Sequence, residues 1–477
     1  MKRLFIFFLV GILVMGCQDQ LANHDPFGES FRGTKAIDAC QIGQIDEPFV
    51  FLAEKDFKAW TDIVSLEDRF AACEVPETIL HMMTTDALVK SALNYPLNFI
   101  YSAYNNPFNL LDLIIKNSTL HRELLGRSDA AEVLIRYFAQ STIDTTNTDS
   151  FINRSESVLS YANELFFDYL MASPQVSGLF NEKEHEKVQR IADCKIAERR
   201  AEPEYFSEWA VAPLLRLSAS SENMQTRSYY VWEWLTPMGK SVWAYNQDEM
   251  TNYEINYWTD VYSQNYPLAS VHAMASGEYN GNGYVWLMMD PTDINSVANE
   301  DNSWLENGGG SGGQMQQFWN EDFYQNCSAS DSEKVYYGTA MDHSAIPYSG
   351  SDTNYISKWG CGPLMEHALA YCPYSTSALS YYRIRTTPAT ISCSINGPDF
   401  VALNVSNAYT FESPVLRGIT KVWSAEAYSG WTSSFYWNPS THQLTCYQDG
   451  AYKIIVQGKY NNNVLVYKEK TVICLPN

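Results

Sequence analysis

Apolar residues recur at helical spacing through residues 49–217, behind residues that typically start helices. Ser65 precedes an acidic first turn, and Thr85 starts a second apolar stretch. Asp129 and Glu132 have the spacing of a capping box, in which each side chain accepts from a backbone N–H at the start of the helix. We therefore expect an N-terminal all-α bundle over residues 49–217.

A longer, highly charged helix is expected over residues 182–200. Its apolar stripe consists of Val188, Ile191 and Ile196. Such a stripe is typical of a helix that packs one face against a core. We interpret it as structural and not as part of a cofactor site.

The pattern changes over residues 218–385, where short β-type runs alternate with loops. Eight of the 13 Trp residues of the chain lie in this segment. The glycine-rich stretch 308–313 lacks the Lys-Ser/Thr pair of a phosphate-binding loop, so we interpret it as a flexible surface loop. We expect a central α+β domain here.

Residues 388–477 show short alternating runs separated by turn residues, a pattern typical of an all-β fold. Tyr452 follows Asp-Gly-Ala and resembles the tyrosine corner of immunoglobulin-like sandwiches, in which the hydroxyl bonds to an upstream backbone group. Trp423 is the candidate core tryptophan. Ile454 stands where antibody domains have a cysteine, so antibody-type disulfide geometry is not expected. We predict a C-terminal immunoglobulin-like β-sandwich.

Residues 1–17 have the composition of an export signal. Lys2 and Arg3 precede an apolar run that is shorter than the roughly 20 residues of a membrane-spanning helix. The sequence Val-Met-Gly-Cys at residues 14–17 resembles a bacterial lipobox, which implies cleavage before Cys17 and lipidation of that residue. Residues 18–48 then form a tether, in which Asp19 resembles the acidic tethers of some surface-exposed Bacteroidetes lipoproteins. An ordinary signal peptide with an incidental cysteine is the alternative.

Composition narrows the class of protein further. The chain has 477 residues, and its 32 basic and 55 acidic side chains give a formal net charge of −23. This charge excludes nucleic acid as a partner, because phosphate binding needs a surface rich in Lys and Arg. The 32 Tyr, 22 Phe and 13 Trp residues indicate a globular chain, since disordered acidic chains are poor in aromatics.

The cysteines do not indicate a metal site. Without Cys17 nine remain, an odd number that leaves at least one thiol unpaired. The chain has no CxxC pair and no HExxH motif, so we expect neither a metal site nor a cofactor. Cys393, Cys446 and Cys474 lie in the last ninety residues, where one disulfide could form.

Three motifs of the central segment follow one another in the same order as in an uncharacterised group of secreted bacterial proteins. They read Tyr-Asn-Gly-Asn-Gly-Tyr-Val-Trp over residues 279–286, His-Ser-Ala-Ile over 343–346 and Ser-Lys-Trp-Gly over 357–360. In that group the first motif reads Tyr-Asn-Cys-His-Ser-Tyr-Ala-Trp. The group in turn resembles CHAP-type and other papain-like amidohydrolases, and the resemblance covers roughly residues 49–385.

This resemblance implies roles for particular residues. In such enzymes a cysteine that opens a helix is activated by a histidine on the following sheet, and a polar residue on the next strand orients the histidine. The general base falls on His343, the orienting residue falls within 357–359, and the nucleophile falls on Gly281. Glycine has no side chain that could attack a carbonyl, so the resemblance implies a papain-like domain that has lost its nucleophile.

Two interpretations place the function in this central domain. In the first, the domain is inactive and binds a ligand in a groove widened at Gly281, with Tyr284, Trp286 and Trp359 as stacking surfaces. In the second, the domain is an active cysteine-type amidohydrolase or peptidase that uses His343 as base. Its nucleophile is then relocated to Cys361 or Ser276.

A third interpretation makes the central domain a scaffold and assigns binding to Trp431, Tyr436 and Trp437 of the C-terminal sandwich. All three describe a multidomain lipoprotein of the bacterial cell envelope, anchored at the outer membrane through its lipid. We expect a binding protein more than an enzyme, with a cell-wall, glycan or protein ligand.

Overall fold

The computed structural model describes residues 44–143, 158–218, 231–236, 240–245, 247–289, 304–306, 314–319, 324–351, 353–385, 393–412, 420–428, 434–460 and 463–476. The predicted export signal, Cys17 and nearly all of the predicted tether lie outside these residues. The glycine-rich stretch 308–313 and Trp431 lie outside them as well.

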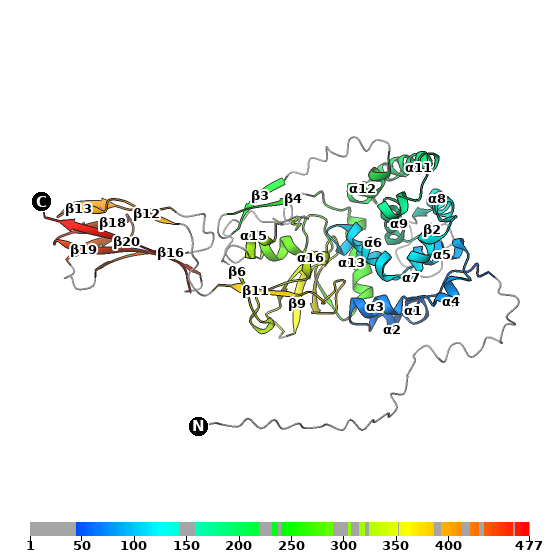
Figure 1. Ribbon diagram of the computed structural model, residues 1–477, viewed down its shortest axis with the longest axis horizontal. Helices are drawn as coiled ribbons and strands as arrows, with labels where there is room; N and C mark the ends of the chain where they lie inside the picture. The colour runs from blue at the N-terminus through cyan, green and yellow to red at the C-terminus, as the bar shows by residue number, and fades with distance from the viewer. Residues whose placement is uncertain are drawn as a thin grey trace, which may run out of the picture. The chain divides into compact units, whose positions relative to one another are not determined.

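Helices dominate the chain between residues 52 and 217, and mostly antiparallel sheets dominate the described residues after 230, as the sequence predicts (Figure 1). The helices of the first part are α1 (Leu52–Lys55), α2 (Phe57–Thr61), α3 (Leu66–Ala72), α4 (Glu77–Leu80), α5 (Thr85–Leu93), η1 (Asn98–Ala103), α6 (Pro107–Asn117), α7 (Thr119–Gly126), α8 (Ala130–Gln140), α9 (Tyr161–Met171), α10 (Pro174–Ser177), α11 (Glu182–Ala201) and α12 (Glu208–Leu217). Two short parallel strands accompany them, β1 (Thr142–Ile143) and β2 (Val158–Leu159).

Local sequence signals account for most of these helix starts. Ser65 caps α3, because its hydroxyl accepts a hydrogen bond from the backbone N–H of Asp68 at 3.1 Å. The expected capping box at Asp129 is wrong: its side chain makes no cap bond and instead accepts from the Thr85 hydroxyl at 2.7 Å. A tertiary hydrogen bond between two helices has therefore replaced the local one.

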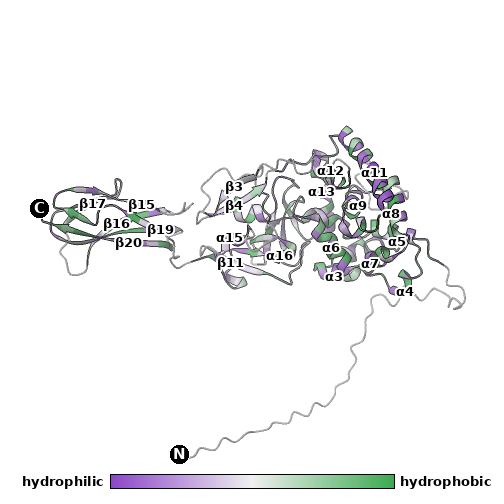
Figure 2. Cartoon of the chain, turned by 45° about the horizontal axis from the view of Figure 1, so that its top comes forward, coloured by the Kyte–Doolittle hydropathy of each residue, from purple (hydrophilic) through white to green (hydrophobic). Residues whose placement is uncertain are grey.

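The charged helix α11 matches its predicted bounds to within one residue. Figure 2 shows hydrophilic residues along it, as expected of a helix with one face in solvent. Val188 and Ile196 of its apolar stripe are buried, and Ile191 packs against the core as a partly buried residue. The stripe is therefore structural.

The central part contains a seven-stranded antiparallel sheet in the order β5-β10-β9-β8-β7-β11-β6. Its elements are β3 (Val231–Leu235), β4 (Ser241–Tyr245), α13 (Asn252–Asn265), β5 (Ser270–Ala273), α14 (Gly281–Gly283), the π-helical turn η3 (Tyr284–Met288), α15 (Gln316–Trp319), β6 (Tyr324–Asn326), η5 (Ala329–Asp331), β7 (Lys334–Tyr336), α16 (Gly338–Met341), β8 (Ser344–Pro347), β9 (Asn354–Lys358), β10 (Leu364–Ala368) and β11 (Ser380–Ile384). Strands β3 and β4 form a separate antiparallel pair.

The helical part and the central part share one hydrophobic core. Trp258 of α13 is fully buried and lies edge-on against Tyr101 of η1 and Trp209 of α12. The turn after β9 packs equally closely: Gly360 has a φ of 54°, and a Cβ there would lie 2.3 Å from the carbonyl oxygen of Ser102. Only glycine permits both this conformation and this close approach.

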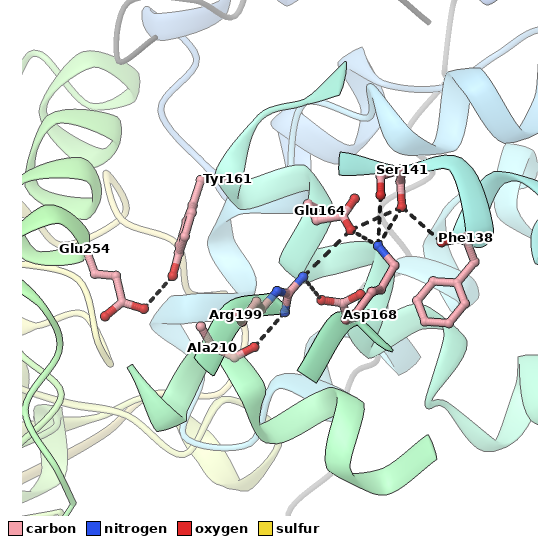
Figure 3. Close-up of polar contacts among 9 residues, drawn as sticks. Phe138, Ser141, Tyr161, Glu164, Asp168, Arg199, Ala210 and Glu254 are labelled. Atoms are coloured by element: carbon pink, nitrogen blue, oxygen red, sulfur yellow. Dashed lines mark hydrogen bonds and ion pairs between the residues drawn. The ribbon is translucent and has the colours of Figure 1, made fainter. Parts of the chain in front are cut away.

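A cluster of buried charges ties α9 to α11 within the helical part (Figure 3). Lys195 pairs with Glu164 and also donates to the Ser141 hydroxyl at 3.0 Å. Arg199 pairs with Asp168 at 2.6 Å, and burial raises the pKa of that carboxyl to about 6. Two cations compensate two carboxylates, so we interpret the cluster as structural.

The C-terminal part is all-β and has a core of its own. Its strands are β12 (Ser394–Asn396), β13 (Phe400–Ala402), β14 (Ser406–Ala408), β15 (Thr410–Glu412), β16 (Thr420–Ala427), β17 (Phe435–Asn438), β18 (Gln443–Cys446), β19 (Gly450–Tyr460) and β20 (Asn463–Leu475). They form a four-stranded sheet β13-β20-β19-β16, a three-stranded sheet β14-β18-β17 and the pair β12-β15.

The hydrogen bond expected of Tyr452 is present in this part. Tyr452 is fully buried, and its hydroxyl donates to the backbone carbonyl of Gln448 at 2.8 Å. Trp423 is partly buried against the same core and stacks on His442 with ring centroids 4.3 Å apart. Trp423 thus borders the core and does not occupy its centre.

Candidate functional site

Gly281 is the first residue of helix α14. The preceding Asn280 caps this helix, because its side-chain oxygen accepts from the backbone N–H of Gly283 at 2.8 Å. The same oxygen accepts from the N–H of Leu305 at 3.1 Å, and the amide nitrogen donates to the carbonyl of Leu305 at 2.8 Å. Asn280 therefore joins the start of helix α14 to Leu305.

Gly281 and His343 lie against each other. A Cβ at Gly281 would lie 2.5 Å from both Nδ1 and Cε1 of His343 and 2.9 Å from the carbonyl oxygen of Lys358. The imidazole therefore occupies the volume that any side chain at Gly281 would need. The expectation of a groove widened at this glycine is wrong, because the histidine ring fills the space.

His343 is held as a buried, neutral ring. It is 2% exposed and stacks on Tyr374, with ring centroids 3.6 Å apart and planes at 10°. Burial, reinforced by the nearby His367, lowers the pKa of His343 well below its usual value. Within the described part of the chain its Nε2 atom has no hydrogen-bond partner. A general base near neutral pH needs a pKa close to that pH, and this environment works against one.

The segment expected to orient His343 contacts a different histidine. The Ser357 hydroxyl lies 2.8 Å from Nε2 of His367, and the indole N–H of Trp359 donates to the same hydroxyl at 3.0 Å. Lys358 donates to the carbonyl of Ser276 at 2.8 Å. The hydrogen bonds of Ser357 and Trp359 described here thus join these two residues to each other and to His367 of β10.

Asp342 and Asn282 hold the loop that carries His343, and sequence reasoning missed both. Asp342 adopts a positive φ of 45°. Its side chain accepts from the Asn282 amide at 2.8 Å, and its carbonyl accepts from the Asn105 amide at 2.7 Å. The Ser344 hydroxyl donates to the oxygen of Asn282 at 2.7 Å. Asn282 stands where the group that the sequence resembles has histidine, and this difference was the available signal.

The three aromatic residues proposed as stacking surfaces are not available to a ligand. Trp286 is 1% and Trp359 0% exposed, and Tyr284 is 9% exposed. Trp286 packs edge-on against Tyr324 and donates its indole N–H to Ser344 at 2.9 Å. The expectation is wrong because these residues build the core around the site.

The environments of Cys361 and Ser276 do not favour either residue as the nucleophile. Cys361 is buried, and burial raises the pKa of its thiol to about 12. The Ser276 hydroxyl donates to the Glu249 carboxylate at 2.8 Å. The Ser276 hydroxyl is thus bound to Glu249, and the Cys361 thiol is buried.

No cluster of three His, Cys, Asp or Glu side chains that could hold a metal ion occurs among the described residues. Glu366 pairs with His272 at 2.9 Å and accepts a hydrogen bond from Asn354 at 2.7 Å. Glu366 and His272 alone are too few ligands for a protein metal site. Over the same residues, no helix combines the length and the apolar character that crossing a bilayer requires.

A scan of the sequence against protein-family models finds no matching family, and a search of curated proteins finds no match.

Proposed function

We propose that this protein is an envelope-anchored, non-catalytic binding protein whose central domain descends from a papain-like amidohydrolase. The observation that carries the proposal is the contact between Gly281 and His343. A helix start and a histidine meet as nucleophile and base do in such enzymes, yet the nucleophile position has no side chain. The order of the elements, α14 followed by His343 at the start of β8 and then β9, supports the same descent.

The anchoring part of the proposal rests on the lipobox-like sequence that ends at Cys17. Lipidation of this cysteine attaches the mature chain to the membrane, since each buried CH₂ group contributes about 0.8 kcal/mol. The variant Cys17→Ala should therefore move from the membrane fraction to the soluble fraction of a bacterial host. Unchanged membrane fractionation of this variant would refute the anchor.

For binding, we propose the outer face of the sheet β14-β18-β17. Leu444 and Cys446 of β18 point into the core, whereas Tyr436 and Tyr447 are 55% and 53% exposed. Tyr436 pairs with Thr445, and the N–H of Tyr447 continues the strand pairing by donating to the carbonyl of Ser434 at 2.9 Å. The two tyrosines are thus diagonal neighbours, a spacing of about 7–8 Å.

Two neighbouring exposed aromatic rings suit a neutral carbohydrate. The faces of aromatic rings pack against the apolar faces of sugar rings, and the tyrosine hydroxyls supply hydrogen bonds at the edge. The net charge of −23 disfavours strongly anionic polymers. We therefore propose a neutral glycan as the ligand and infer that the central domain serves as its scaffold.

The double variant Tyr436→Ala/Tyr447→Ala tests this assignment. We expect its affinity to fall at least about tenfold for those neutral polysaccharides that retard the full-length wild type in affinity electrophoresis. The reason is that each stacked ring contributes ~1 kcal/mol or more. Tyr467→Ala, which removes a tyrosine 43% exposed on the other sheet, is the matched control and should bind normally. The glycan site would be refuted if both variants bound polysaccharides equally well, or if the wild type bound protein ligands and no polysaccharide.

A further inference from the structure

Cys446 and Cys474 meet in the core of the C-terminal part. Cys446 ends β18 in the three-stranded sheet, and Cys474 lies near the end of β20 in the four-stranded sheet. Both side chains belong to the same hydrophobic core, where they are 0% and 2% exposed. Each thiol affects the pKa of the other, so the two thiols lie close together within this core. Both thiols are free in this structure, and they come from the two different sheets.

The third cysteine of this region is placed differently. Cys393 is partly buried and packs against the core cluster that contains residues of the central sheet. Cys446 and Cys474 belong to a different core cluster. Of the three cysteines that the sequence leaves open, the structure therefore brings only Cys446 and Cys474 together.

We propose that Cys446 and Cys474 are a redox modification site and form an intramolecular disulfide that joins the two sheets. An exported chain meets compartments in which disulfides form and persist. The link would close a loop of 29 residues, from Cys446 to Cys474, and stabilise the C-terminal part by restricting its unfolded state. This inference rests on the export that the proposed function includes, and it is independent of any ligand.

The oxidant is a small or protein disulfide of the thiol-exchange class. The thiolate of Cys446 attacks one sulfur of the donor disulfide, which forms a mixed disulfide and expels one donor thiolate. The thiolate of Cys474 then attacks the Cys446 sulfur and expels the second donor thiolate. The protein loses two electrons and two protons, and the donor gains both as two thiols.

Burial determines when this exchange can happen. It raises the pKa of the Cys446 thiol to about 12 and also raises that of Cys474, so little thiolate exists in the folded state near neutral pH. Exchange should therefore be slow in the folded protein and fast while the chain folds. Once formed, the disulfide is shielded from reductants by the same core.

The test uses the full chain, refolded from denaturant with a mixture of oxidised and reduced glutathione and mapped by non-reducing peptide mass spectrometry. We expect a peptide pair linked through Cys446 and Cys474 and an unfolding temperature of the C-terminal part that falls by at least about 5 °C on reduction. Cys446→Ser and Cys474→Ser should each abolish this dependence on reductant. Cys393→Ser is the control and should retain it.

Two results would overturn the proposal. One is full alkylation of both thiols after oxidative refolding of the wild-type chain, which requires no variant to fold. The other is a linked peptide that contains Cys393 in place of either partner. A folded, reduced protein that oxidises as fast as an unfolded one would refute the shielding by the core.

Discussion

The centre of the molecule and the outer face of its C-terminal sheet are both rich in aromatic residues but use them in opposite ways. Around His343, the rings of Trp286, Trp359 and Tyr374 are almost completely buried. On the strands β17 and β18, Tyr436 and Tyr447 are more than half exposed. The aromatic-rich composition therefore has two causes, a densely packed core and a separate exposed surface.

The difference also separates chemistry from binding. At the centre a helix start lies against His343, but the imidazole is buried against a glycine and burial lowers its pKa well below the usual value. The sheet face has no candidate catalytic group among its described residues and offers accessible rings. Substitutions in the centre should therefore change stability, and substitutions on the sheet face should change binding.

Trp286→Ala should produce the largest effect on stability. Removing a buried indole that packs against Phe318, Tyr324 and Tyr382 is expected to lower the free energy of unfolding by about 3–5 kcal/mol. Urea denaturation followed by circular dichroism measures it. If the variant does not fold, Trp286→Phe should still show a smaller loss of the same sign. A fully stable Trp286→Ala would contradict the assignment of this residue to the core.

Gly281→Ala should come next. Its Cβ would approach His343 and the carbonyl oxygen of Lys358 more closely than van der Waals contact allows. We therefore expect overpacking to lower the free energy of unfolding by about 1–3 kcal/mol. Gly126→Ala is the matched control, because a Cβ there meets nothing within 4 Å. This control lies in helix α7 and should be neutral or stabilised by up to about 1 kcal/mol.

Gly281→Cys sharpens the same point. Its thiol would need His343 to move out of the volume that it fills, so we expect destabilisation similar to that of Gly281→Ala. A variant of normal stability with a rapidly alkylated new thiol would show that the imidazole yields readily. That outcome would contradict the description of this site as closed.

The buried imidazoles should also make stability depend on pH. Burial holds the pKa of His367 at about 4, below that of an exposed histidine near 6.5. Between these two values the unfolded chain binds a proton that the folded chain does not. With respect to His367, the folded state is therefore fully stable above pH 6.5 and loses stability as pH falls toward 4. His367→Gln should reduce the slope of the unfolding free energy between pH 6 and 4.5 by about 1 kcal/mol per pH unit.

Chemical denaturation at several pH values measures this slope. His81→Gln is the control, since the His81 side chain is 69% exposed, and it should leave the slope unchanged. Asp168 acts in the opposite sense, because its raised pKa favours the folded state as pH falls through about 6 toward 4. For that reason the prediction is tested by comparing the pH slopes of wild type, His367→Gln and His81→Gln, and not by the pH dependence of the wild type alone. Identical slopes for wild type and His367→Gln would contradict it.

Tyr436→Ala should have the smallest effect on stability. Its ring is 55% exposed, so the unfolding free energy should change by no more than about 0.5 kcal/mol. A large loss of stability would show that the ring packs against the fold, and the proposed binding face would lose its basis.

Local signals in the sequence predicted the elements more reliably than the environment of the site. The cap at Ser65, the helix over 182–200 and the hydrogen bond of Tyr452 follow from spacing within a few residues, and the structure contains all three. Asp129 is the exception, because Thr85, 44 residues away, takes its side chain. No local pattern contains that contact.

Sequence order could suggest that Gly281 and His343 are neighbours but not which residues surround them. Burial of Trp286 and Trp359 depends on packing between segments far apart in the chain, which periodicity does not describe. The bond between Ser357 and His367 joins adjacent strands β9 and β10, and only their register reveals it. The role of Asp342 likewise depends on Asn105, a residue of the helical part.

The most direct test of the central claim is hydrolysis by the full-length protein. Wild type and His343→Ala should be incubated with a panel of peptides and peptidoglycan fragments, and released amines should be quantified alongside labelling with a thiol-reactive probe. We predict no turnover above the buffer control for either protein and no labelling that depends on His343. Turnover by wild type that His343→Ala abolishes would contradict the claim that this centre is non-catalytic.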